Sequence, residues 1–213
     1  SGQLSGLTRV RAITQDDGHL FCRVSQIKDE VKSITDIIKT FYTTLWMTSD
    51  YWVSLSVRWE DKSIYLGWDD VWEQAEEALE AASKENDLPY KRIEWEAAFY
   101  GPKLDFMFKD AIGREWQLAT IQCDFNLPVR FELEFTNEQW EKERPVVIHR
   151  AISGSLERWM WVFIEHFAWV FPLWMAPRQV IIVPVMPMFD EYATKVMNEL
   201  KASWIRVTWD FST

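Results

Sequence analysis

A polar stretch near the start of the chain carries side chains whose types and order could form a binding site. Residues 9–22 read Arg-Val-Arg-Ala-Ile-Thr-Gln-Asp-Asp-Gly-His-Leu-Phe-Cys. In a β-strand, successive side chains point to opposite faces. One face would then carry two cations, an amide, a carboxylate and an imidazole: Arg9, Arg11, Ile13, Gln15, Asp17 and His19. Such a face could hold an anion at one end and a polar or metal-bound group at the other; the alternative is the solvated side of an amphipathic sheet.

Two of the three histidines, His19 and His149, are candidate metal ligands. Imidazole nitrogen is a common ligand of zinc. The two residues lie far apart in the sequence, without the short ligand spacing that identifies a zinc site locally. From residue types alone, a packed or surface histidine is therefore the more frequent outcome.

Three later segments add polar candidates, each with an ordinary structural alternative. Gln122 and Asp124 would share one strand face with Thr120, which is also what a polar sheet face looks like. The Gly101-Pro102 pair before Lys103 reads equally as a simple turn. Gly154-Ser-Leu-Glu-Arg158 would begin a helix, and a helix N-terminus favours phosphate through its dipole and free amides; its charged residues could instead be a surface pair.

Hydrophobic periodicity predicts the elements that would position these residues. We expect helices at 25–45, 69–85, 155–167 and 189–202. We expect strands at 51–57, 103–109, 115–125, 129–135, 145–149, 179–185 and 205–209, with a turn at 153–154. Successive strands with helices on one face predict an α+β domain around an antiparallel sheet. The last strand–helix–strand segment predicts a parallel, right-handed βαβ unit, and we expect two domains, 1–175 and 176–213.

Composition and charge limit the classes of protein. With 213 residues, of which 48% are hydrophobic, the chain can bury a sizeable core. Its net charge of −10 argues against a protein that coats nucleic acid, because phosphate binding needs clustered cations. A local basic patch near Arg144 still allows RNA contact.

Membrane insertion and a disulfide framework are both disfavoured. The apolar stretch 159–176 is interrupted by Glu165, His166 and Pro172, which predicts a buried helix and its exit, not a membrane span. Two cysteines, Cys22 and Cys123, suggest a reducing compartment.

Four spaced segments carry a family pattern. They are residues 6–22, Ala98-Phe-Tyr-Gly-Pro-Lys-Leu-Asp105, Thr120-Ile-Gln-Cys-Asp-Phe125, and residues 144–158 with their Gly-Ser-Leu-Glu-Arg. In this order they resemble the threonyl-tRNA synthetases, which are class II aminoacyl-tRNA synthetases; the first segment looks like the second half of motif 2 and the last like motif 3. The resemblance implies a partial class II catalytic domain built on an antiparallel sheet, then the first βαβ unit of an α/β anticodon-binding domain.

The resemblance also implies a function for the complete protein. This would be ATP-dependent ligation of threonine to tRNA(Thr) through threonyl-adenylate, in a cytoplasmic, zinc-dependent homodimer. The expected partners are threonine, ATP with magnesium, and tRNA(Thr), with no membrane and no DNA.

The resemblance assigns roles to individual residues. His19 and His149 would ligate zinc. Lys103, Arg11 and Arg158 would assist the reaction, and the expected ATP contacts are Arg11, Gln122 and Arg158. The residues expected to contact substrate are Gln15, Asp17, Tyr100, Gln122 and Ser155.

Some family features are missing from the sequence. The family's third zinc ligand is a cysteine before motif 2, and Cys22 cannot replace it, because three residues after His19 on a strand it faces away. Motif 1, the first strand of motif 2 and an editing domain are also missing, and Ile13 stands where the family has phenylalanine. We therefore expect a piece of a longer protein that is inactive alone.

Three other functions compete with this one. They are a prolyl-like class II synthetase, a zinc hydrolase using His19, His149 and Asp17, and a non-catalytic binding module derived from a synthetase. Threonine-dependent ATP–pyrophosphate exchange separates an enzyme from a module, and activity toward proline would identify the prolyl-like enzyme.

Tryptophan and glycine occur in unusual proportions. The chain has fourteen Trp and seven Gly, whereas glycine averages about 7% of residues, roughly fifteen in a chain of this length. Several tryptophans fall where local backbone rules favour glycine, such as the ends of helices and tight turns. We hypothesise that UGA codons for glycine have been translated as tryptophan at seven positions: Trp46, Trp59, Trp95, Trp140, Trp161, Trp169 and Trp204.

Overall fold

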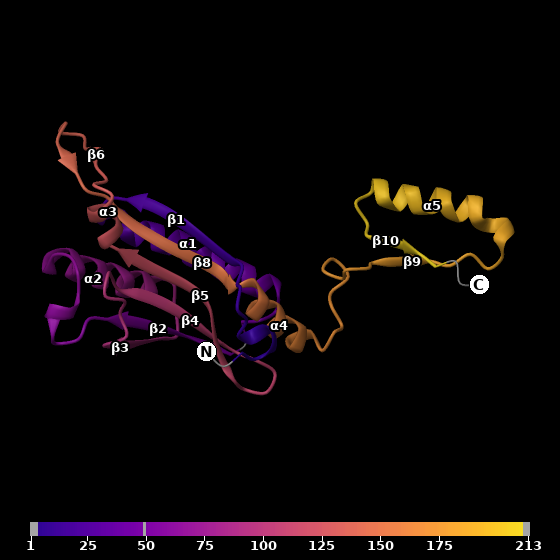
Figure 1. Cartoon of the computed structure of the whole chain (residues 1–213), viewed down its shortest axis with the longest axis horizontal. Coiled ribbons are helices and arrows are strands. Elements are labelled where there is room, and N and C mark those ends of the chain that lie inside the picture. Colours follow the sequence, from indigo (N-terminus) through magenta and orange to yellow (C-terminus); the bar gives the residue numbers. More distant parts are fainter. Residues whose placement is uncertain (1–3, 49, 211–213) are drawn as a thin grey trace. The chain divides into compact units, whose positions relative to one another are not determined.

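The computed structural model describes residues 4–48 and 50–210. These residues form two compact units, which meet between His166 and Phe167 in the sequence (Figure 1). The division after His166 lies earlier than the boundary expected after residue 175. Each unit has its own architecture.

The first unit is built on a six-stranded sheet in the order β1-β8-β5-β4-β2-β3 (Figure 1). Its strands are β1 (Gln15–Cys22), β2 (Tyr51–Val57), β3 (Tyr90–Glu94), β4 (Lys103–Lys109), β5 (Glu115–Asp124) and β8 (Val146–Ser155). All neighbouring strands are antiparallel except β2 and β3, which are parallel. The sheet confirms the predicted α+β class with a mainly antiparallel sheet.

Two amphipathic helices, α1 (Ile27–Thr44) and α2 (Asp69–Glu85), cover one face of this sheet. Their buried faces follow helical spacing, and β4 turns Leu104, Phe106 and Phe108 toward them, each at most 2% exposed. Tyr42 of α1 stacks on Phe108 with the ring centroids 4.0 Å apart. Burial of this apolar surface drives the packing and leaves the alternate side chains of each strand on the other face.

Further elements lie between the strands of the sheet or at its two ends in the sequence. They are the 3-10 turns η1 (Gly6–Thr8), η2 (Val24–Gln26) and η3 (Lys62–Ile64), the helix α3 (Asn126–Arg130), the hairpin strands β6 (Phe135–Thr136) and β7 (Lys142–Glu143), and the helix α4 (Leu156–Phe167). In the part of the chain that the structure describes, no helix has the length and apolar character needed to cross a membrane.

The strand predicted at 129–135 is wrong. The short helix α3 occupies its start, because the Asp124 carboxylate caps this segment by accepting the backbone N–H groups of Asn126 and Leu127 at 2.7 and 2.9 Å. Only its last residue, Phe135, begins a strand. Strand β3 was not predicted from the sequence.

The predicted turn at 153–154 is wrong as well, because β8 continues through Gly154 to Ser155. The Asp16 carboxylate accepts the backbone N–H groups of Ile152, Ser153 and Gly154, which keeps this end of β8 paired with β1. The stretch expected to be extended from Arg9 is a strand only from Gln15 onward.

The second unit contains the predicted βαβ arrangement. Strands β9 (Val180–Ile182) and β10 (Val207–Trp209) pair in parallel, and the turn η4 (Pro187–Phe189) and the helix α5 (Asp190–Ala202) connect them. The parallel pairing is confirmed. Its identity as the start of an anticodon-binding domain stays a prediction.

Candidate active site and metal site

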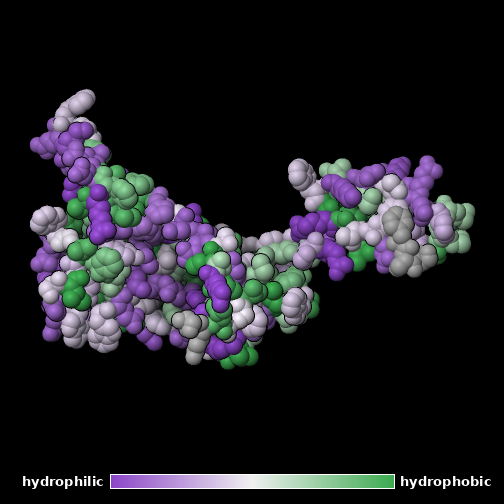
Figure 2. Space-filling model, viewed as in Figure 1, coloured by the Kyte–Doolittle hydropathy of each residue, from purple (hydrophilic) through white to green (hydrophobic). Residues whose placement is uncertain are grey.

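Polar side chains from four strands form a row across the face of the sheet opposite α1 and α2. Register pairs His19 of β1 with His149 of β8, His149 with Gln122 of β5, and Gln122 with Lys103 of β4. These residues are far apart in the sequence, yet they are neighbours on adjacent strands. In Figure 2, hydrophilic side chains gather over the middle of the sheet on the face turned to the viewer.

A second row runs beside the first, two positions along each strand. Asp17 and Thr120 both pair with Ala151, and Asp105 pairs with Thr120. Asp105 is only 4% exposed and accepts hydrogen bonds from Lys103 Nζ, Gln117 Nε2 and Thr120 Oγ1. The Lys103 ammonium group is therefore held on the floor of the site.

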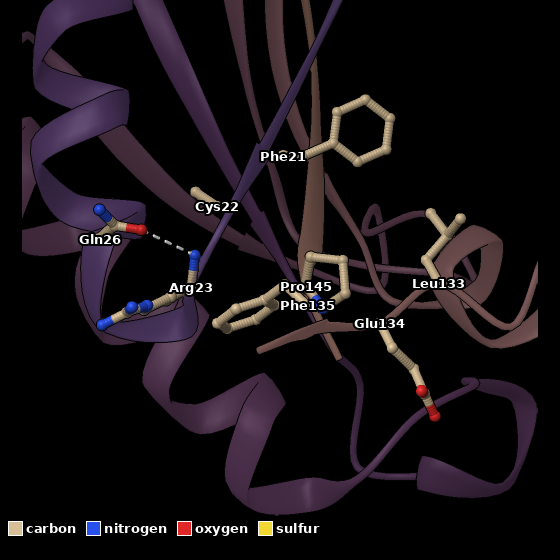
Figure 3. Close-up of a pocket in the computed structure, with 8 residues that line it drawn as sticks. All are labelled: Phe21, Cys22, Arg23, Gln26, Leu133, Glu134, Phe135 and Pro145. Atoms are coloured by element: carbon tan, nitrogen blue, oxygen red, sulfur yellow. Dashed lines mark hydrogen bonds between the residues drawn. The ribbon is translucent and has the colours of Figure 1, made fainter. Parts of the chain in front are cut away.

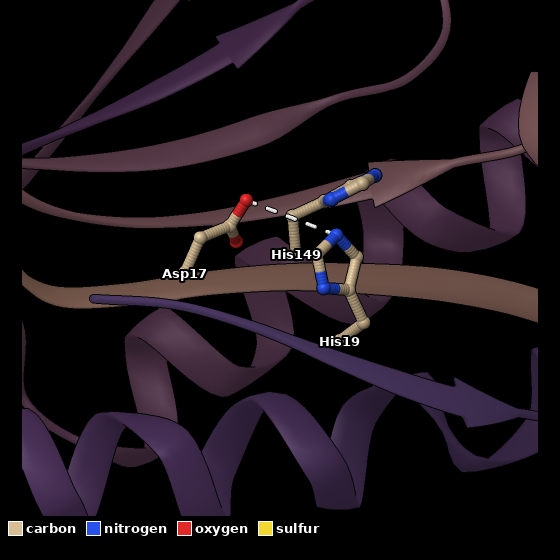
Figure 4. Close-up of side chains that lie close together, drawn as sticks. All are labelled: Asp17, His19 and His149. Carbon is tan, nitrogen blue, oxygen red and sulfur yellow. Dashed lines mark ion pairs between the residues drawn. The ribbon is translucent and has the colours of Figure 1, made fainter. Parts of the chain in front are cut away.

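Asp17, His19 and His149 form a cluster that could hold a metal ion (Figure 4). Their ligand atoms all lie within 4.8 Å of one another, with His19 Nε2 3.7 Å from Asp17 Oδ2. The two imidazole rings meet edge to face with centroids 4.6 Å apart. Two imidazoles and a carboxylate are ligand types that zinc accepts. Asp17 was expected to contact substrate, and the structure places its carboxylate next to both histidines.

Neither cysteine belongs to this cluster. Cys22 is buried on the other side of β1, and burial, with the Glu30 carboxylate, raises the pKa of its thiol to about 11. Burial also raises the pKa of Cys123. Both thiols therefore stay protonated near neutral pH, and the expectation that Cys22 faces away from His19 is confirmed.

Asp124 positions the His149 ring through a hydrogen bond. Its Oδ2 lies 3.0 Å from His149 Nε2, so Nδ1 is the nitrogen left to bind a metal ion. Burial alone would raise the pKa of Asp124, but the hydrogen bonds from His149 and from the amides of Leu127 and Asn126 bring it below its ordinary value. A carboxylate therefore faces Nε2 at neutral pH. Asp124 was expected on this face of the sheet, but its role beside His149 was not predicted from the sequence.

A cavity of about 330 Å³ adjoins the second row. It is lined by residues 8–10, 13 and 15, by β5 and by the junction of β8 and α4. Four of the predicted residues contribute to it: Gln15, Gln122, Ser155 and Arg158. Arg9 also lines it, whereas Arg11 is exposed and does not. Amides, a hydroxyl and two cations could bind a polar, anionic ligand here.

Hydrogen bonds hold the walls of this cavity together. The Thr14 backbone N–H donates to the Glu157 carboxylate at 3.0 Å, and Arg158 Nε donates to the carbonyl of Thr8 at 3.3 Å. Asp16 fixes the bulge between Gln15 and Asp17. Sequence reasoning missed Asp16, although two consecutive aspartates on a strand already place one on each face.

Tyr100 closes over the first row. Its hydroxyl donates to Gln122 Oε1 at 2.9 Å. Burial raises the pKa of this phenol, and the carboxylates of Asp124, Asp105 and Asp17 raise it further, so Tyr100 is a neutral donor. The structure thus brings Tyr100 and Gln122 together as predicted for a shared site.

A second cavity, also about 330 Å³, lies at the far end of β1 (Figure 3). It is lined mainly by apolar groups, including Phe21, Leu133, Phe135 and Pro145, and none of the predicted site residues contributes to it. It therefore plays no part in the site described above.

Comparison with known families and curated proteins gives a consistent picture. A family model described as tRNA synthetase class II core domain (G, H, P, S and T) matches residues 1–167. Threonine–tRNA ligases of Bacteroides thetaiotaomicron and Gloeobacter violaceus are 52% and 49% identical over 211 and 213 residues, covering 99% and 100% of this chain. The alignments cover 32% and 34% of those proteins, so the chain spans about a third of their length.

Solved structures show the same similarity. The RNA binding domain of threonyl-tRNA synthetase from Cryptosporidium parvum superposes with a TM-score of 0.88 and 39% identity, over 98% of this chain and 52% of that one. A putative threonyl-tRNA synthetase from Aeropyrum pernix gives 0.81 and 33%, over 97% and 49%. Prolyl-tRNA synthetase from C. parvum gives 0.59 at 18% identity, over 97% and 38%, which is a likeness of fold alone.

Proposed function

The chain belongs to the class II tRNA synthetases, and we propose that the protein carrying it ligates threonine to tRNA(Thr) through threonyl-adenylate. The observation that carries this proposal is the row of His19, His149 and Gln122 with Asp17 beside it. An apolar pocket separates threonine poorly from valine, whereas a site built to hydrogen-bond the hydroxyl discriminates strongly. The row supplies such polar groups.

We propose that His19 and His149 hold zinc, with Asp17 close enough to accept the proton of the substrate hydroxyl. The donor set supports this, because two imidazoles and a carboxylate converge on one point of the sheet. When bound, zinc would supply a Lewis-acidic centre for the amino and hydroxyl groups of threonine.

The other residues of the site would bind and orient the two substrates. The cavity lined by Gln15, Ser155 and Arg158 suits ATP with its magnesium, and Arg158 would face the phosphates. Lys103 lies on the neighbouring strand, where its ammonium group can neutralise charge as carboxylate and α-phosphate meet. Positioning and charge stabilisation are what this reaction needs from a protein. The two free, buried cysteines fit a reducing compartment such as the cytoplasm.

Amino-acid-dependent ATP–pyrophosphate exchange by the protein that carries this chain tests the assignment. We expect exchange with threonine, exchange at least about 100-fold weaker with valine, and none with proline. Relatives at about 50% identity are threonine ligases, whereas the prolyl enzyme shares 18%. Exchange that responds to proline and not to threonine would refute the proposal.

Replacing Asp124 with asparagine should weaken zinc binding by about 10- to 100-fold without unfolding the protein. The asparagine oxygen can still accept the N–H groups of Asn126 and Leu127. Its amide would donate to His149 Nε2 and place the ring proton on Nδ1, the nitrogen needed for metal. Titration with zinc measures the affinity, and circular dichroism checks the fold.

Asp110→Asn is the matched control. Asp110 is about as buried as Asp124, because 7% of Asp110 and 4% of Asp124 are exposed. Asp110 accepts hydrogen bonds from Arg114 and Trp116 and does not belong to the metal cluster. This variant should lose stability and keep its zinc affinity. Unchanged zinc affinity in Asp124→Asn would show that Asp124 does not position His149.

A further inference from the structure

Five tryptophans adopt a backbone conformation that bulky residues avoid. Among the described residues, eight that are not glycine have positive φ, and five of them are tryptophan, with φ between 55° and 68°: Trp46, Trp95, Trp140, Trp169 and Trp204. Glycine has no Cβ and reaches this region freely, whereas a large side chain there is a clear outlier. Only fourteen residues of the 213 are tryptophan, so this concentration needs a specific cause.

Trp46 and Trp204 occupy the glycine position of Schellman motifs at the ends of α1 and α5. After α1, the Trp46 N–H donates to the Thr43 carbonyl at 3.0 Å, and the Met47 N–H donates to the Tyr42 carbonyl at 2.9 Å. The end of α5 repeats this pair of hydrogen bonds, from Trp204 to Lys201 and from Ile205 to Leu200. In this motif the left-handed residue, here Trp46 or Trp204, is usually glycine.

Trp140 occupies the glycine position of a hairpin. Between β6 and β7, the Trp140 N–H donates to the Asn137 carbonyl at 3.1 Å, and the Asn137 N–H donates to the Glu141 carbonyl at 2.9 Å. These hydrogen bonds close a tight turn whose last residue, Trp140, is left-handed, a position where glycine is favoured. Trp169 follows the end of α4, and Trp95 follows β3.

Burial does not compensate for these conformations. All five side chains are exposed, from 64% for Trp46 and Trp95 to 92% for Trp204. Trp72, in contrast, is 1% exposed, and its indole N–H donates to the Leu66 carbonyl at 2.6 Å. Trp72 has the environment expected of a native tryptophan, and the five others have the environment expected of glycine.

Backbone conformation supports glycine at five of the seven positions inferred from sequence, and glycine at the other two, Trp59 and Trp161, stays a prediction. Trp59 and Trp161 are not among the described residues with positive φ, so backbone conformation gives no reason for glycine at either. Trp161 lies within α4, where the negative φ of a helix suits tryptophan as well as glycine.

We propose that the native protein carries glycine at positions 46, 95, 140, 169 and 204. The codon UGA links the two residues, because different genetic codes assign it to tryptophan or to glycine. This pattern arises if the source organism reads UGA as glycine and the UGA codons of its gene are translated with a code that reads UGA as tryptophan.

The gene and the protein made by its own source test this directly. The five codons should be UGA, whereas Trp72 should be encoded by UGG. Mass spectrometry of peptides from the native protein should give glycine at the five positions. UGG codons there, or peptides that contain tryptophan, would overturn the proposal.

Unfolding of the 213-residue chain tests the backbone argument separately. At each of the five positions, a Trp→Gly variant should melt about 2–4 °C above the matching Trp→Ala variant, because alanine keeps the strain that glycine removes. Trp52, within strand β2, is the control, and there Trp52→Ala should melt above Trp52→Gly. Alanine variants as stable as glycine variants at the five positions would contradict the inference.

Discussion

Replacing His149 with alanine is expected to abolish zinc binding and, with it, threonine activation by the protein that carries this chain. His149 provides one of the two imidazole ligands proposed for zinc, and Asp124 positions its ring through a hydrogen bond. Even loss of a supporting residue costs about 10- to 100-fold in metal affinity, so loss of the ligand itself should cost more. Elemental analysis of purified protein and zinc titration give the stoichiometry and affinity.

The Arg158→Ala variant tests whether the cavity proposed for ATP can be impaired without loss of the metal site. Arg158 lines the cavity beside Ser155 and is not part of the cluster. This variant should therefore keep its full zinc content and use ATP poorly, with a raised KM for ATP or a lowered kcat. Zinc retained at wild-type stoichiometry in His149→Ala would exclude His149 as a ligand.

Replacing Gly101 with alanine is expected to destabilise the first unit by about 3 kcal/mol or more. A Cβ at this position would overlap the carbonyl oxygen of Cys123, a backbone atom at the buried end of β5. The loop would have to move away. It would then lose the hydrogen bonds that join Cys123 N–H to Pro102 and Phe125 N–H to Tyr100, at 3.0 and 3.1 Å. Urea unfolding followed by circular dichroism measures the change.

Gly113→Ala is the matched control for this substitution. Gly113 has φ of +83°, and an added Cβ there would meet no atom within 4 Å. Only backbone strain should remain, about 1–2 kcal/mol. If both variants lost the same stability, the close approach to Cys123 would not be the cause.

Gly101→Ala should also shift Tyr100 away from Gln122, which fluorescence or structure determination would detect.

Local pattern determined much of the fold. The helix α2 was predicted at 69–85 and is found there, and β2 and β4 likewise match their predicted ranges. Each of these segments has an apolar period that is set by burial of one face, so a few adjacent residues suffice to identify it. One error lies where a distant group overrides the local signal, because Asp16 keeps residues 152–154 in β8.

The sequence also contained the residues of the candidate site, through their resemblance to family motifs, and the excess of tryptophan over glycine. The sequence alone did not show how the residues of the candidate site are arranged in space. Only the sheet order β1-β8-β5-β4 brings His19, His149, Gln122 and Lys103 into one row, and only register sets Asp17 beside both histidines. Pairing between distant strands depends on how the whole apolar face packs against α1 and α2, and a shift of one residue would turn every one of these side chains to the other face.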